Sequence, residues 1–168
     1  MFPADAFDRI CELPANCQGV CVYEAAQAAA GIWAAAETGR GIPPVGSELL
    51  STFQRWLEEK ASSAELKNAS DRLLNVLPQN LPDEPDDALR AGFAGWAVLG
   101  VATIALKEAP DVQDSILQSA VVHAARSVVG PCRREFWEGP DTWSAEERQF
   151  LCDWWERCCV AFPKLRGG

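Results

Sequence analysis

One uncharged stretch constrains the fold of this chain more than any other feature. It runs from Ala91 to Leu106 (AGFAGWAVLGVATIAL), and Thr103 is its only polar side chain. On a helical wheel its apolar side chains face every direction, so a helix here has to be covered on all sides. At ~1.5 Å per residue it would span about 24 Å. A membrane-spanning helix needs roughly 20 residues, which span about 30 Å, so this stretch is too short. The stretch therefore predicts the buried central helix, over about 88–108, of a helical bundle in water.

The other hydrophobic segments also have helical spacing, and Pro and Gly clusters separate them. We predict Asn16, Ser47 and Asp111 as N-caps, and Ser144 with Glu147 has the spacing of a capping box. No segment shows the alternation of a strand. The sequence thus predicts a single all-α domain, residues 1–168, with six to seven helices. Its expected parts are a short N-terminal helix within 1–15, a helix over 17–38 against the central one, further helices near 47–59, 63–77, 111–129 and 144–162, a loop over 131–143 and a frayed tail over 164–168.

The charge of the chain limits its partners. It has 15 basic and 24 acidic residues and a formal net charge of −9. An acidic surface repels phosphate groups, so we expect neither nucleic acid nor an anionic membrane as a partner. A basic protein fits this charge, although solubility alone would also explain it. The cysteine count is seven, without disulfide-scaffold spacing, and no signal peptide is visible. We therefore expect reduced thiols and a cytoplasmic location.

Four carboxylates precede the central helix: Asp83, Glu84, Asp86 and Asp87. Acidic side chains at the start of a helix interact favourably with the helix dipole, which explains them without any function. Two of them could instead act as a general acid and a general base. A third interpretation is a recognition patch for Lys and Arg of a basic partner, since charged patches steer association. We keep the recognition patch as a candidate partner-binding site.

A second candidate site is the loop before the last predicted helix. It combines cationic and aromatic residues, the types enriched at interaction hot spots. These residues are Arg133, Arg134, Phe136, Trp137 and Trp143. The alternative is that the rings fold back as a lid over one end of the bundle. Both interpretations of the loop stay open.

Cysteine and histidine are the remaining candidates for chemistry. Cys17 and Cys21 are one helical turn apart, and Cys152 and Cys159 are two turns apart. If their helices packed together, four thiolates could surround a zinc ion. However, no pair has C-x-x-C spacing, and buried cysteine is also a common small apolar residue. His123, the only histidine, would have to be the base of any Cys–His pair, but a surface or boundary histidine is the favoured interpretation. We predict no cofactor and no metal.

The absence of catalytic motifs favours binding over catalysis. The sequence has no P-loop, no G-x-G-x-x-G, no H-E-x-x-H, no C-x-x-C-H and no G-x-S-x-G. We therefore expect a non-catalytic acidic protein-binding module. The alternative is a cysteine-dependent enzyme, or a sensor of a metal or another ligand, on a helical bundle.

The order of segments from about Val20 to Val129 carries a resemblance. An early Cys- and Ala-rich helix (GVCVYEAAQAAAGIW) is followed by a Leu/Trp helix (ELLSTFQRWLEEK). A proline- and acid-rich loop then leads into the apolar helix (LPDEPDDALRAGFAGWAVLGVA). This layout resembles a bacterial all-helical family of unknown function. It also looks like the helical immunity proteins of bacterial toxin systems, which are small, acidic and cytoplasmic. That resemblance implies a basic toxin as the partner, but it transfers no site residue.

Overall fold

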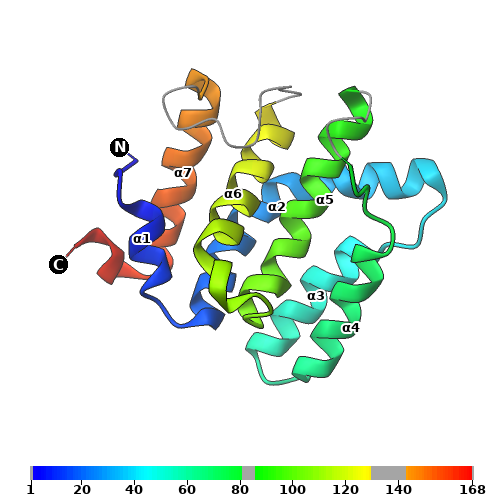
Figure 1. Ribbon diagram of the computed structural model, residues 1–168, viewed down its shortest axis with the longest axis horizontal. Coiled ribbons are helices and arrows are strands. Elements are labelled where there is room, and N and C mark those ends of the chain that lie inside the picture. The colour runs from blue at the N-terminus through cyan, green and yellow to red at the C-terminus, as the bar shows by residue number, and fades with distance from the viewer. Residues whose placement is uncertain (1, 81–85, 130–142, 168) are drawn as a thin grey trace.

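The computed structural model describes residues 2–80, 86–129 and 143–167. Within these ranges the chain is helical and contains no strand, which confirms the all-α prediction (Figure 1). The α-helices are α1 (Ala6–Cys11), α2 (Ala15–Arg40), α3 (Val45–Leu57), α4 (Ser63–Leu74), α5 (Asp86–Ala105), α6 (Gln113–Val129) and α7 (Ala145–Ala161). Two short 3-10 helices, η2 (Pro110–Val112) and η4 (Pro163–Arg166), precede α6 and follow α7.

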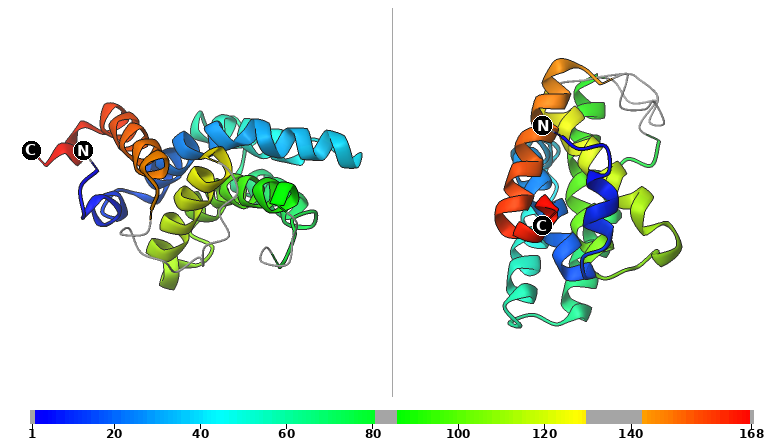
Figure 2. Two further views of the ribbon diagram at one scale, coloured as in Figure 1. Left: turned by 90° about the horizontal axis from the view of Figure 1, so that it is seen from above. Right: turned by 90° about the vertical axis from the view of Figure 1, so that its left-hand side faces the viewer.

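The predicted central helix is α5, and it packs against α2, α3, α4 and α6. Figure 2 (left) shows α5 and α6 beside each other on the same side of the long helix α2. With 20 residues, α5 is longer than the apolar stretch alone. Its Asp87–Ala105 segment is long and apolar enough to cross a membrane, but 78% of the most apolar window is buried inside the protein. A helix covered by other helices matches the expectation of a bundle core.

Small residues let α5 approach its neighbours closely. A Cβ atom on Gly100 would lie 2.6 Å from the Cβ atom of Ala120 in α6. On the other side, a Cβ atom on Gly19 of α2 would lie 2.8 Å from the Cβ atom of Ala105. Both distances are far below an ordinary van der Waals contact. The backbones at these crossings are therefore as close as glycine permits, and a larger residue would push the helices apart.

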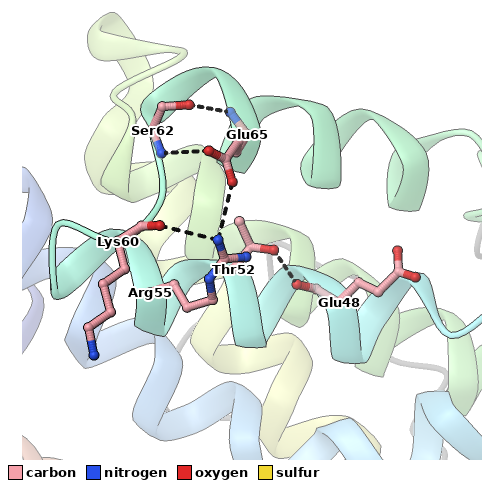
Figure 3. A network of polar contacts seen from close by, with 6 residues as sticks. All are labelled: Glu48, Thr52, Arg55, Lys60, Ser62 and Glu65. Carbon is pink, nitrogen blue, oxygen red and sulfur yellow. Dashed lines mark hydrogen bonds and ion pairs between the residues drawn. The ribbon is translucent and has the colours of Figure 1, made fainter.

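Two helix starts have capping boxes. Ser144 and Glu147 cap α7 as predicted: each side chain accepts a hydrogen bond from the backbone N–H of the other residue. The same reciprocal bonds join Ser62 and Glu65 at the start of α4, as Figure 3 shows. In the same figure Arg55 donates to the carbonyl of Lys60 and to Glu65. Each capping box satisfies N–H groups that a helix leaves without an internal acceptor.

The three other predicted caps are wrong. Helix α2 begins at Ala15, before Asn16, and α3 begins at Val45, before Ser47. Asp111 lies inside η2, and α6 begins only at Gln113. At α3 the acceptor comes from another helix, because the buried Glu37 side chain of α2 accepts a hydrogen bond of 3.1 Å from the backbone N–H of Gly46.

The tail predicted as frayed over 164–168 is instead folded back up to Gly167. Its 3-10 helix η4 buries Leu165, which is 3% exposed. Nη1 of Arg9 in α1 donates a hydrogen bond of 3.0 Å to the carbonyl of Leu165. The apolar side chain and this bond to α1 hold the segment, whereas the sequence shows only a short polar end.

Candidate functional site

The two predicted partner-binding patches are only partly placed. Asp83, Glu84, Arg133, Arg134, Phe136 and Trp137 lie outside the described residues. Asp86 is the first residue of α5, and Asp87 follows it as an exposed residue. Trp143, immediately before the cap of α7, is 8% exposed, and its ring centre lies 6.1 Å from that of Phe2. Little of this ring is therefore available to a partner.

The described neighbours of both patches meet at one end of the bundle. In Figure 1 the start of α5, the end of α6 and the start of α7 all lie at the upper end. Arg90 of α5 joins the first two, because its guanidinium donates to the carbonyls of Ser127 and Val128 in the last turn of α6. The last carbonyls of a helix have no N–H donor within the helix. The arginine supplies that donor, and its positive charge interacts favourably with the C-terminal end of the helix dipole.

The helices that carry the cysteine pairs, α2 and α7, do pack together. Nε1 of Trp154 donates a hydrogen bond of 2.7 Å to the carbonyl of Cys21. The thiol that meets Cys21 is that of Cys158, which lies outside the predicted set, and a hydrogen bond joins their side chains. Cys21 and Cys159 are buried, whereas Cys17 and Cys152 are partly exposed. Residues 2–80, 86–129 and 143–167 contain no group of three or more His, Cys, Asp or Glu residues that could hold a metal ion.

The environment of the thiols disfavours nucleophilic chemistry. The hydrogen bond with Cys21 and then burial raise the pKa of Cys158. Burial is the main cause that raises the pKa of Cys11 and of Cys159. A raised pKa keeps a thiol protonated at neutral pH, and the thiolate is the nucleophile. These three cysteines therefore have the character of structural residues.

A mainly apolar cleft of about 330 Å³ lies between α5 and α6. Its walls include the side chains of Trp96 and Leu99 from α5 and of Ile116 from α6. Nε1 of Trp96 donates a hydrogen bond of 2.9 Å to the carbonyl of Pro78, which fixes the indole ring. The polar side chains along the cleft belong to Thr103, Ser115, Ser119 and His123. No motif in the sequence indicates this cleft, because it forms only where the two helices cross.

His123 lies where this cleft adjoins a second cavity of about 200 Å³. Arg126 and Trp143 line the second cavity, and the His123 ring centre lies 5.2 Å from that of Phe93. Burial, and then the positive charge of Arg126, lower the pKa of His123 to about 3. Both effects penalise the imidazolium ion, so the ring is neutral at pH 7. The boundary position predicted for His123 agrees with its partial exposure.

The lowered pKa of His123 predicts a loss of stability in mild acid. An unfolded chain, with a histidine pKa near 6.5, binds a proton there before the folded protein does, so stability falls as the pH drops below that value. Between pH 7 and pH 5 we expect the free energy of unfolding to fall by about 1 to 2 kcal/mol more in the parent protein than in His123→Gln. The difference should lie near the lower figure, because the ring is partly exposed. Urea unfolding at both pH values measures this, and equal losses in the two proteins would contradict it.

No family model matches this chain, and the comparisons with curated proteins and with solved structures found no match either.

Proposed function

We propose that this chain is a non-catalytic acidic protein-binding module that holds a basic protein in the bacterial cytoplasm, in the manner of an immunity protein against a basic toxin. The support comes from an acidic face formed by Asp8 of α1, Asp111 of η2 and Asp114 of α6. All three side chains are exposed. Helix α1 packs against α6. Burial raises the pKa of Cys11 at the end of α1, and the charges of Asp114 and Asp8 raise it further.

The acidic face keeps its charge, unlike much of the remaining surface. Elsewhere carboxylates are neutralised by neighbours, for example Asp5 by Arg9 at 2.8 Å and Glu156 by Arg166 at 2.8 Å. None of the three residues of the acidic face forms an ion pair with a described basic residue. This unbalanced charge is the observation that carries the proposal, because uncompensated surface charge attracts a basic partner and sets its orientation.

The alternative of a cysteine-dependent enzyme has less support. The buried Cys158 and Cys159 have raised pKa values, and the His123 ring is placed against Phe93. A thiol nucleophile needs a base within hydrogen-bonding reach and a lowered pKa. Binding requires neither, so we place the function on the surface.

Charge reversal tests the acidic face. The proteins encoded by the two flanking genes are purified, and their binding to this chain is measured by calorimetry at low and high salt. For a basic partner we expect Asp8→Lys/Asp114→Lys to weaken the affinity by about tenfold or more and to reduce its salt dependence. The matched control is Glu146→Lys/Asp153→Lys on α7, which changes the net charge equally.

The control double variant matches the test in a second respect, since Asp114 and Glu146 both lie in the first turn of a helix. We expect it to change the affinity by no more than about threefold, as for a charge remote from the contact. Equal effects of the two double variants would refute a role of the acidic face. Failure of both flanking products to bind would count against the immunity function itself.

A further inference from the structure

We propose that the α5–α6 cleft binds an uncharged, mainly apolar small molecule, which places its polar group against Ser115 or Ser119. This inference goes beyond the proposed protein-binding function and does not depend on it. The cleft is formed on one side by α5 and on the other by η2 and α6. A volume of about 330 Å³ lies within the usual range for small-molecule sites, which are mostly apolar with a few polar groups.

The apolar part of the cleft has a fixed shape. The Trp96 indole is held by its hydrogen bond to Pro78, and Leu99 is 7% exposed in α5. Val112, at 47% exposure, is among the most exposed large apolar residues, and it also lines this cleft. An exposed apolar side chain next to an apolar cavity gains from being covered, because burial removes its surface from water.

Two hydroxyl groups are available to a ligand. The Thr103 hydroxyl already donates a hydrogen bond of 3.2 Å to the carbonyl of Leu99 in its own helix. Ser115 and Ser119 are exposed on successive turns of α6, and neither side chain has a hydrogen-bond partner among the described residues. A ligand that carries one donor or acceptor group can use them, because a hydroxyl offers both functions.

The charge of the lining selects an uncharged ligand. No Asp, Glu, Lys or Arg belongs to the described lining of the apolar cleft, and the low pKa of His123 leaves its ring neutral at pH 7. An ionic group in such a place would lose its hydration without gaining a counter-charge. By contrast, the lining of a cavity beside α1 is charged and includes Asp5, Arg9 and Lys164.

The test uses two dyes that share one ring system. N-phenyl-1-naphthylamine is uncharged, whereas 8-anilinonaphthalene-1-sulfonate adds a sulfonate to the same skeleton. Fluorescence titration of the folded chain should show saturable binding of the uncharged dye at one site and affinity weaker by about tenfold or more for the sulfonate. Ser119→Trp, which fills the cleft from an exposed position, should weaken binding of the uncharged dye by about tenfold.

Val160→Trp is the control, because Val160 is 77% exposed on α7 and does not line the cleft. It should leave the affinity for the uncharged dye within about twofold. Circular dichroism checks the fold of each variant, and Ser115→Trp replaces Ser119→Trp if the latter is unfolded. Absence of saturable binding, equal affinity for the two dyes, or equal affinity of the cleft and control variants would each overturn the proposal.

Discussion

Replacing Gly100 by Ala is expected to destabilise the protein by about 1 to 3 kcal/mol, because the added methyl group overpacks the crossing of α5 and α6. The new Cβ atom would lie 2.6 Å from the Cβ atom of Ala120, which is attached directly to the backbone of α6. No side-chain rotation can relieve this contact, so the two helices have to separate. Separation loosens the packing along both helices.

Gly31→Ala is the matched control for this prediction. Gly31 is exposed in α2, and a Cβ atom there would meet nothing within 4 Å. Since alanine favours a helix over glycine by about 1 kcal/mol, this variant should be more stable than the parent. Chemical unfolding of the three proteins measures both changes. Stabilisation by both substitutions would mean that α5 and α6 are not in close contact at Gly100.

Gln18→Leu is expected to lower the free energy of unfolding by about 2 to 4 kcal/mol, because several buried polar groups would lose their partners. Nε2 of Gln18 donates to the carbonyls of Cys11 and Leu13, at 3.1 and 2.8 Å. Its Oε1 accepts a hydrogen bond of 3.2 Å from Nε2 of Gln113, which also donates to the carbonyl of Ile104. This pair of amides thus connects the end of α1, α2, α5 and α6.

Gln149→Leu provides the comparison, because Gln149 donates to Asp153 at 2.9 Å in an exposed position. Water can replace that partner, so we expect a change within about 0.5 kcal/mol. Urea unfolding of the two single variants separates the buried amide from the exposed one. Similar small losses in both would show that the Gln18–Gln113 pair contributes little to the stability of the fold.

The sequence predicted the helices better than it predicted their ends. Both successful predictions used local information: the uncharged apolar stretch indicated the core position of α5, and the spacing of Ser144 and Glu147 indicated a capping box. The cap of α3 could not be found this way, because Glu37 belongs to another helix. The Gln18–Gln113 pair is equally invisible, since 95 positions separate its members.

The candidate sites depended even more on the tertiary structure. The acidic face combines residues from α1 and from the start of α6, so no single run of acidic residues in the sequence indicates it. The sequence drew attention instead to the run from Asp83 to Asp87, where the four charges are close together in the chain. Likewise the α5–α6 cleft joins two helices whose patterns each indicate only a buried side, and its shape depends on how the helices cross.

Hydrogen exchange of the parent protein tests the central claim most directly, namely that the bundle is organised around the largely buried helix α5. The slowest amides should be those of α5 between Phe93 and Ile104, which should exchange only through global unfolding, with a protection free energy equal to that from urea unfolding. The amides of α1 and η4, at the edge of the bundle, should exchange faster. Exchange of the α5 amides as fast as those of α1 would contradict this account.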